Sequence, residues 1–249
     1  MAIVWTKTVG ENRYEVRKAG HSLRLYTNGV FHSQFNAQRP IMANVWNLLL
    51  LPAFIPPVGE VERVLVLGVG GGAVIRLLQK CVSPSQIIGV ELDPTHLYIA
   101  HRFFGVTRRR AELVEADAKD WLRRYEGPPF DLIIDDLFGH ARGEAARTIG
   151  ADDDWLSLLS QKLSNSGVLA INFFDAKALR EAGRVLREID SAQFSDVLSV
   201  TLSAYENRVG VFVSHALGEH SLREKLRQSQ TSCSRRLAAL PYHVRRVRP

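Results

Sequence analysis

A glycine-rich turn between a predicted strand and a predicted helix constrains the fold of this chain more than any other feature. A short β-branched run leads directly into the turn, and apolar residues then recur at helical spacing. A second β-branched run follows and ends at Glu91. This order predicts a nucleoside site, where main-chain N–H groups face the ligand and Glu91 accepts hydrogen bonds from ribose hydroxyls. Taken alone, the glycines could instead form a tight turn with a purely structural role; they are Gly68, Gly70, Gly71 and Gly72.

Strands and helices continue to alternate after Glu91. Apolar, strand-like runs occupy residues 111–115, 130–136 and 168–173, with helical patterns between them, and two last runs at 195–204 and 208–214 have the pattern of an antiparallel pair. We therefore predict an α/β protein with a doubly wound, mostly parallel seven-stranded sheet of Rossmann-like type.

The first forty residues have a different pattern, with short alternating runs separated by glycine-containing turns. One turn is Asn28-Gly29, a strong hairpin signal, so a small antiparallel sheet of three or four strands is expected. Pro40 then suits a first helical position, and a mostly apolar helix is expected up to residue 51. The predicted units are an N-terminal β extension at 1–39, a nucleoside-binding domain at 40–217 and a basic C-terminal helix and tail at 218–249.

The two cysteines, Cys81 and Cys233, lie far apart and have no metal-type spacing. This argues against a disulfide framework and a structural zinc site, so we expect reduced thiols, no bound metal and a cytoplasmic setting. The longest apolar stretch, at residues 45–58, is interrupted by Asn47 and by prolines and is too short to span a bilayer. The first residues also lack the apolar core of a signal peptide, and no membrane association is expected.

Positive charge is concentrated near the end of the chain. Residues 222–249 hold eight basic residues and one acid, whereas the whole chain has a formal charge of +6. A basic segment can bind nucleic acid. Because its only aromatic residue is Tyr242 and no known reader motif occurs, a solvated terminus is the favoured interpretation over a nucleic-acid site.

Polar residues follow several of the predicted strands. Ligands of doubly wound sheets lie across the carboxyl ends of the strands, where Asp117, Asp136 and Asn172 join Glu91. Asp93 and Asp175 also follow strands, but these two are better explained as helix N-caps.

These motifs together resemble the spermidine synthase branch of the class I S-adenosylmethionine-dependent transferases. The resemblance rests on VLVLGVGGG, GVELDP, VEADAKDWL, FDLIIDDLFG and SGVLAINFF, within residues 22–214. An N-terminal β extension is typical of that branch, and the resemblance implies a homodimer. It further implies that Glu91 holds the ribose, Asp117 and Ala118 the adenine edge, and the turn at 68–72 the sulfur-bearing chain, with Asp136 at the position of the catalytic aspartate.

The departures from that family change the expected chemistry. Aminopropyltransferases have G-G-G-D-G, whose aspartate pairs with the amine of decarboxylated S-adenosylmethionine, and this chain has Gly71 there. Without the carboxylate, the amine loses its partner, and the carboxylate of ordinary S-adenosylmethionine is no longer repelled. The second aspartate of the family's D-S-S-D-P loop is absent, its Tyr-His-Glu helix start is replaced by residues 40–43, and its hairpin glutamine falls at His32, with Gln34 two residues on.

The leading hypothesis is therefore a spermidine synthase-like methyltransferase that uses S-adenosylmethionine on an unidentified acceptor. Asp136 would orient or deprotonate the nucleophile, and His140 in the following loop is a second candidate. His32 and Gln34 would form the opposite wall of the acceptor site, with ordinary hairpin surface as the alternative. Two other hypotheses are a polyamine aminopropyltransferase (spermidine synthase) that uses decarboxylated S-adenosylmethionine, and a non-catalytic protein that binds a nucleoside or a partner.

Overall fold

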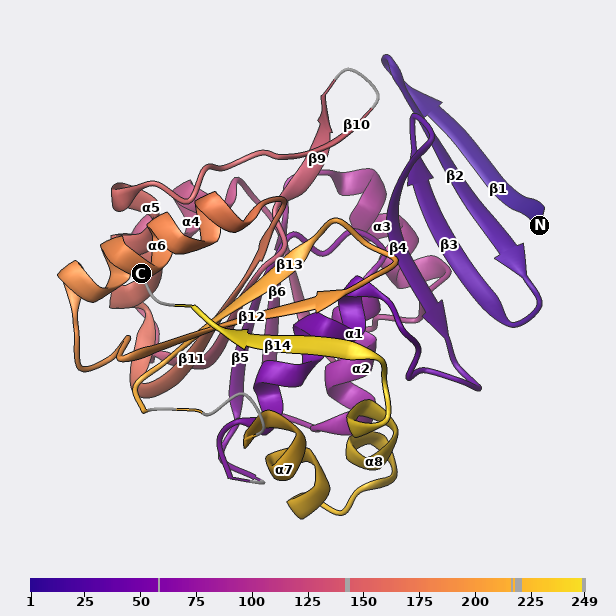
Figure 1. Cartoon of the computed structure of the whole chain (residues 1–249). Helices are drawn as coiled ribbons and strands as arrows, with labels where there is room; N and C mark the ends of the chain where they lie inside the picture. Colours follow the sequence, from indigo (N-terminus) through magenta and orange to yellow (C-terminus); the bar gives the residue numbers. More distant parts are fainter. Residues whose placement is uncertain (58, 142–143, 216, 218–220, 248–249) are drawn as a thin grey trace.

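The central element of the computed structural model is an eight-stranded mixed sheet with helices on both faces (Figure 1). The structure describes residues 1–57, 59–141, 144–215, 217 and 221–247, and side chains within them except those of 140–147. In these ranges, no helix combines the length and the apolar character needed to cross a membrane.

The central sheet has the strand order β14-β12-β13-β11-β8-β5-β6-β7. The five strands from β11 to β7 are parallel, and the other three pair antiparallel at one edge. The predicted α/β fold is confirmed, with one strand more than expected because β14 forms within the C-terminal tail. The strands are β5 (Arg63–Leu67), β6 (Gln86–Glu91), β7 (Glu112–Glu115), β8 (Phe130–Asp135), β11 (Leu163–Phe173), β12 (Asp196–Leu202), β13 (Arg208–Val213) and β14 (Tyr242–Arg246).

Helices cover both faces because the central strands are apolar on both sides. Along β5, Val64 and Val66 pack into the core beneath α1–α3, and Leu65 and Leu67 pack into the core beneath α4–α6. The helices are α1 (Val45–Leu50), the 3₁₀ helix η1 (Leu51–Phe54), α2 (Ala73–Cys81), α3 (Pro94–Arg102), α4 (Ala118–Arg124), α5 (Asp153–Gln161), α6 (Ala176–Ile189), α7 (Ser221–Gln228) and α8 (Ser232–Ala238).

The predicted N-terminal β extension is a separate four-stranded antiparallel sheet, seen in indigo in Figure 1. Its β3–β4 turn holds Asn28 and Gly29 at φ values of 51° and 83°, which suits a tight hairpin. Val16 and Leu25 are fully buried and join the main core, so the sheet packs on the central domain. The strands are β1 (Ala2–Val9), β2 (Asn12–Ala19), β3 (Ser22–Thr27) and β4 (Val30–Asn36).

Two segments differ locally from the expectation. The helix expected from Pro40 begins only at Val45, because the side chain of Asn44 caps it by accepting a hydrogen bond from the Asn47 amide at 3.0 Å. The loop expected after β8 contains a short hairpin, β9 (Phe138–Ala141) and β10 (Glu144–Arg147).

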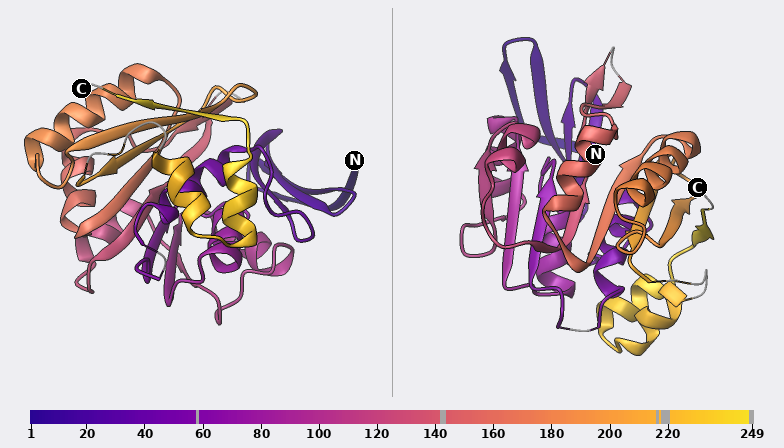
Figure 2. Two further views of the ribbon diagram at one scale, coloured as in Figure 1. Left: turned by 60° about the horizontal axis from the view of Figure 1, so that its bottom comes forward. Right: turned by 90° about the vertical axis from the view of Figure 1, so that its left-hand side faces the viewer.

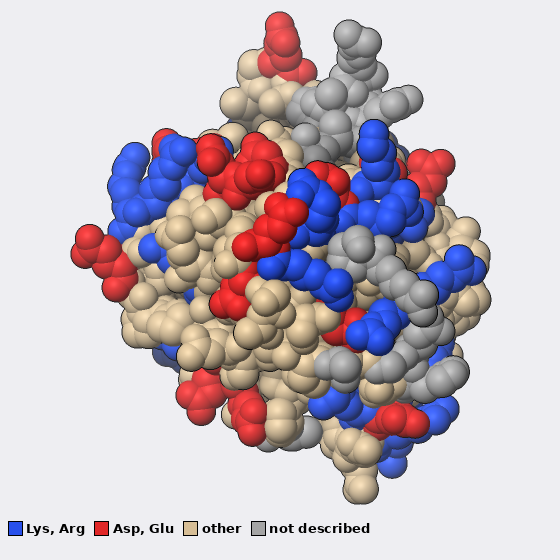
Figure 3. All heavy atoms as spheres, turned by 60° about the vertical axis from the view of Figure 1, so that its left-hand side comes forward, with Lys and Arg blue, Asp and Glu red and all other residues tan. Residues whose placement is uncertain are grey.

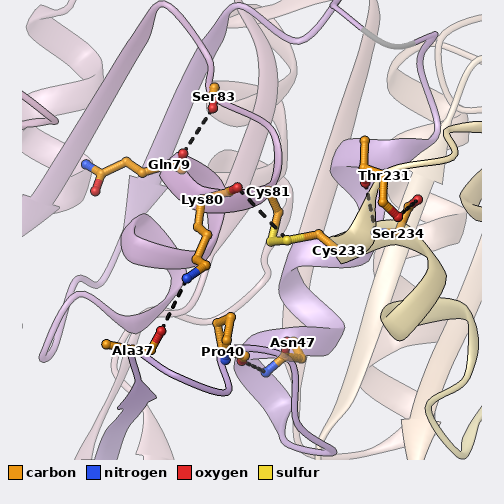
Figure 4. The surroundings of a disulfide bond; sticks show 10 residues. All are labelled: Ala37, Pro40, Asn47, Gln79, Lys80, Cys81, Ser83, Thr231, Cys233 and Ser234. Carbon is orange, nitrogen blue, oxygen red and sulfur yellow. Dashed lines mark hydrogen bonds between the residues drawn. A yellow bond between two sulfur atoms is a disulfide. The ribbon is translucent and has the colours of Figure 1, made fainter.

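The C-terminal segment, α7–α8–β14, lies along the end of α2 and adds its strand to the sheet edge (Figure 2). Here the expectation of two reduced cysteines is wrong, because Cys81 at the end of α2 and Cys233 in α8 form a disulfide, with Cα atoms 5.5 Å apart (Figure 4). The prediction failed because the two cysteines are 152 residues apart in the sequence, and only the tertiary fold brings α8 next to α2. The described residues contain no free cysteine.

Part of the positive charge of this segment is used inside the fold. Arg223 donates to the carbonyls of Leu240 and Tyr242, at 3.2 and 2.7 Å, and Arg246 forms an ion pair with the fully buried Asp196 at 2.5 Å. On the face shown in Figure 3, basic and acidic side chains intermix. That face therefore has no extended surface of one sign.

Candidate functional site

A cavity lies between the carboxyl ends of the parallel strands and the N-terminal sheet. The strand ends contribute the glycine turn, Glu91, Asp136 and Asn172, and the N-terminal sheet contributes β4. This is the edge of a doubly wound sheet where ligands bind. The lining residues are Phe31, His32, Val45, Trp46, Gly68, Val69, Gly70, Glu91, His96, Asp136, Phe138, Asn172, Tyr205 and Asn207.

The glycine turn forms one wall with its main chain. Gly68 has φ +82°, and a Cβ on it would lie 2.3 Å from the carbonyl oxygen of Asp136. Gly70 has φ +52°, a backbone conformation that glycine adopts without strain. The turn therefore exposes backbone rather than side chains to the cavity.

Gly71 lies outside the lining and points into packed side chains. A Cβ at this position would come within 2.8 Å of Ser33 Cβ and 2.9 Å of Phe104 Cζ. Ser33 belongs to β4, and its hydroxyl accepts a hydrogen bond from the Ala73 amide at 3.4 Å, at the start of α2. The space that a side chain at position 71 would need is therefore filled by β4 and by the segment after α3.

Glu91 connects the glycine turn to the end of β6. Its Oε2 accepts hydrogen bonds from the amides of Val69 and Gly70 at 3.0 and 2.8 Å, and its Oε1 accepts from the Asp93 amide at 3.0 Å. Burial alone would raise the pKa of Glu91, but His96, with Nδ1 3.8 Å from Oε2, and these amides lower it to about 2. Glu91 is thus a carboxylate at the edge of the cavity.

A polar network joins this carboxylate to the N-terminal sheet. His96 Nε2 lies 2.8 Å from Thr27 Oγ1, and the Tyr14 hydroxyl donates to Asp93 Oδ2 at 2.6 Å. Burial lowers the pKa of His96, but Glu91 and Asp93 raise it more, so the net direction is upward. Burial and the Asp93 carboxylate raise the pKa of Tyr14 to about 12. The sheet thereby contacts the residues that hold Glu91.

Asp136, directly after β8, also lines the cavity. Its Oδ1 accepts a hydrogen bond from Asn172 Nδ2 at 2.8 Å, and Asn207 Nδ2 donates to Asn172 Oδ1 at 3.3 Å. Asp135, the preceding residue, is fully buried and accepts from the Trp155 indole at 2.8 Å. Only Asp136 of the two adjacent acids therefore faces the cavity, as strand alternation requires.

The structure places His32 in the cavity lining and Gln34 outside it. The prediction that both form one wall of the acceptor site assumed regular strand alternation, but the β3–β4 register shifts between Leu25 and Tyr26, so His32 is the extra residue of a bulge. The bulge lets the neighbouring Phe31 and His32 both line the cavity. The ring of His32 lies 5.1 Å from that of His96.

Three of the remaining expected site residues, Gly72, Asp117 and Ala118, are not among the described residues that line the cavity. Gly72 ends the turn with φ +79° and packs against Val106. Asp117 caps α4, with its Oδ1 3.0 Å from the Asp120 amide, and Ala118 is the buried first residue of that helix. His140 lies on β9, and its side chain is outside the described residues.

Several lining residues had no signal in the sequence. Phe31, Trp46, Phe138 and Tyr205 give the cavity aromatic walls, and they come from four separate segments. His96 had a weak signal, since it is a polar residue one turn after the N-cap of α3. Among the described residues, no group of three His, Cys, Asp or Glu side chains could hold a metal ion.

Comparison with known sequences gives partial matches. No protein-family model matches the chain. It is 35% identical over 88 residues to polyamine aminopropyltransferase 2 of Caldanaerobacter subterraneus, covering 32% of this chain and 30% of the relative. It is 33% identical over 85 residues to the eEF1A lysine and N-terminal methyltransferase homolog of Drosophila melanogaster, covering 32% of this chain and 13% of that protein. The chain thus spans less than a third of the length of each of these curated relatives.

Comparison with solved structures covers nearly the whole chain. A probable spermidine synthase from Corynebacterium glutamicum superposes with a TM-score of 0.74 at 17% identity, over 99% of this chain and 91% of that one. Human methyltransferase-like protein 13 in complex with SAH superposes with a TM-score of 0.57 at 23% identity, over 79% of this chain and 90% of that one.

The fold is therefore that of the class I S-adenosylmethionine-dependent methyltransferases. Within that fold, the chain resembles the spermidine synthase-like branch in its partial sequence similarity to polyamine aminopropyltransferase 2 and in its superposition on a probable spermidine synthase.

Proposed function

We propose that this protein is a methyltransferase that uses S-adenosylmethionine and acts on a small acceptor with an amine or hydroxyl nucleophile. Its relatives support transferase activity in general, since they include proteins named as aminopropyltransferases and as a methyltransferase. Fold neighbours solved with SAH and with the transition-state analogue AdoDATO support a related cofactor. The choice of methyl transfer depends on one position in the glycine turn.

Gly71 is the observation that carries this choice. Aminopropyltransferases of the resembled family have an aspartate at this position, which pairs with the amine of decarboxylated S-adenosylmethionine. Here Ser33 and Phe104 fill the space into which such a side chain would project. A carboxylate is therefore both absent and sterically excluded, which favours the cofactor that itself carries a carboxylate.

The cavity fits a nucleoside cofactor in three respects. The side-chain-free turn at Gly68 and Gly70 permits close approach of a ligand to the backbone. Glu91, held as a carboxylate, would accept hydrogen bonds from ribose hydroxyls. Outside the cavity lining, Leu92 exposes 66% of its surface next to Glu91, and the adenine would extend over it towards Asp117 and the backbone of Ala118 beyond β7.

The acceptor would occupy the space in front of Asp136. When bound, S-adenosylmethionine supplies a methyl carbon whose bond to sulfur breaks, with the electron pair left on sulfur, as the nucleophile attacks. Asp136 would orient that nucleophile and accept its proton, and Asn172 holds the carboxylate in place. Trp46 and Phe31, which also line the cavity, would exclude water from the acceptor.

Ligand-dependent melting tests the cofactor assignment. S-Adenosylmethionine and S-adenosylhomocysteine should raise the melting temperature, whereas decarboxylated S-adenosylmethionine should have little effect. A larger rise in melting temperature with decarboxylated S-adenosylmethionine than with S-adenosylmethionine would overturn the Gly71 argument. It would favour aminopropyl transfer, for which the similarity to polyamine aminopropyltransferases is the supporting observation. In that event, incubation with putrescine should yield spermidine.

Substitution at Asp136 tests the catalytic assignment. Asp136→Asn should leave cofactor binding unchanged and lower methyl transfer to a panel of amines and alcohols by about 10²–10⁴-fold. Asp120→Asn, at an exposed acid on α4, is the matched control. Cofactor binding with no transfer to any acceptor by the wild type would favour the non-catalytic hypothesis.

A further inference from the structure

The aromatic end of the cavity lies beside an arginine that the proposed reaction does not use. The guanidinium of Arg24, on β3, lies 5.7 Å from the ring of Phe31, which lines the cavity. Its charge also lowers the pKa of Tyr205, another lining residue, against the larger effect of burial, which raises it. Arg24 therefore acts on both aromatic side chains at this end.

Arg24 has no ion-pair partner among the described residues. Its Nη1 makes a weak contact with the sulfur of Met1 at 3.8 Å, and its buried Nε has no hydrogen-bond partner. An arginine with unsatisfied donors beside a cavity is suited to an anionic ligand group, because its planar fork matches a carboxylate.

The negative charge of the cavity is limited to two carboxylates among the described lining residues, Glu91 and Asp136. The proposed function assigns Glu91 to the ribose and Asp136 to the acceptor, and both carboxylates line the cavity. A diamine requires anionic groups for two ammonium ions. A second ammonium ion beside Phe31 and Tyr205 would meet the positive charge of Arg24 instead.

Polar groups connect Asp136 to the β12–β13 turn that carries Tyr205. From Asp136 they continue through Asn172 to Asn207, at 2.8 and 3.3 Å, and Asn207 lies two residues from Tyr205 on the β12–β13 turn. Phe31 and Trp46 pack edge to face, with centroids 5.0 Å apart, and give this space an apolar wall. The cavity thus combines an acid and aromatic rings in its lining with a cation beside two of those rings, Phe31 and Tyr205.

We infer that Arg24 determines acceptor specificity and that the acceptor is a primary amine with an anionic group at its far end, of the ω-amino acid class. The amine would lie at Asp136, the carbon chain against Phe31 and Trp46, and the anionic group at Arg24. This inference rests on the proposed function, because it identifies the acceptor of that same reaction.

Three compounds with the same four-carbon chain test it. 4-Aminobutanoate, n-butylamine and putrescine would be titrated by calorimetry into the full-length protein, with and without saturating S-adenosylhomocysteine. 4-Aminobutanoate should bind about tenfold more tightly than n-butylamine, and putrescine should bind most weakly. Arg24→Gln should bring 4-aminobutanoate and n-butylamine to equal affinity, and Arg24→Glu should make putrescine the preferred ligand of the three.

Arg17 provides the matched control. It pairs directly with Arg24 across β2 and β3, but it is held by Glu15 at 2.6 Å and stacks on Tyr26. Arg17→Gln should therefore keep the wild-type order of affinities. Preference of the wild type for putrescine, an unchanged order in Arg24→Gln, or no binding of the three compounds at millimolar concentration would overturn the inference. Failure of S-adenosylhomocysteine to bind while the order holds would count against the proposed function alone.

Discussion

The two extensions of the central domain have different relations to the cavity. The N-terminal sheet supplies Phe31 and His32 to its lining and Tyr14 and Thr27 to the network around Glu91. The C-terminal segment α7–α8–β14 supplies none of the cavity-lining residues that the structure describes. It is attached instead by the Cys81–Cys233 disulfide, by buried leucines and by pairing of β14 with β12.

The N-terminal sheet therefore shapes the site, and the C-terminal segment stabilises the fold. The N-terminal sheet contacts the site through polar side chains whose charge and orientation affect a ligand. The C-terminal segment contacts the opposite end of α2, away from the glycine turn, through apolar burial and a covalent bond. Substitutions in the first should change binding, and substitutions in the second should change stability alone.

Removal of the disulfide should have the largest effect. Cys81→Ser with Cys233→Ser opens a loop of 152 residues, so the free energy of unfolding should fall by up to about 5 kcal/mol. Denaturant unfolding measures this, and reductant should affect the wild type in the same way. Affinity for S-adenosylmethionine should change less than twofold; a tenfold loss would show that the C-terminal segment also affects the cavity.

Removal of the Glu91 carboxylate should have the next largest effect. Glu91→Ala leaves the Val69 and Gly70 amides without their acceptor and removes the proposed ribose contact. Calorimetry should show a loss of cofactor binding of about 3 kcal/mol, or more than 100-fold. Glu112→Ala, at an exposed glutamate on β7, should bind normally. Wild-type affinity in Glu91→Ala would contradict the placement of the cofactor.

A methyl group at Gly71 should cost about 1–3 kcal/mol in stability, because it overpacks against Ser33 and Phe104. Unfolding of Gly71→Ala measures the loss, and Ser33→Gly in the same chain should recover part of it. Gly150→Ala, where a Cβ has open space, is the control. Additive effects of the Gly71 and Ser33 substitutions would contradict the close packing.

The pH dependence of stability should show the smallest of these effects. Because folding raises the pKa of His96, its contribution is fully present below its unfolded value of about 6.5 and is lost as pH rises through the higher folded value. Wild-type unfolding free energy should therefore fall from pH 6 to pH 9 by more than that of His96→Gln. His21→Gln, at an exposed histidine between β2 and β3, should retain the wild-type slope.

Much of the fold could be predicted from the sequence because its signals are local. The strand, glycine turn and helix around Gly68 depend on neighbouring residues, as do the Asn28-Gly29 hairpin and the N-caps Asp93 and Asp175. The disulfide and β14 could not be predicted in the same way. The cysteines meet only through the tertiary fold, and the many charges of the tail obscured the strand signal around Tyr242.

The candidate site was predictable where a residue follows a strand. Glu91 and Asp136 lie in the cavity for that reason. The aromatic walls could not be predicted from the sequence. Trp46 and Tyr205 reach the cavity from α1 and from the β12–β13 turn, and only packing brings these two segments together. Likewise, no pattern in β4 signals the bulge at His32.

The packing around Gly71 limits how this chain could change its cofactor in evolution. A mutation that introduced an acid at this position would meet Ser33 and Phe104 before it could contact any ligand. Smaller residues would first have to appear in β4 or after α3, where they would bring no benefit of their own. The order of mutations therefore matters, because a single change at position 71 is blocked by neighbours that lie in other elements of the fold.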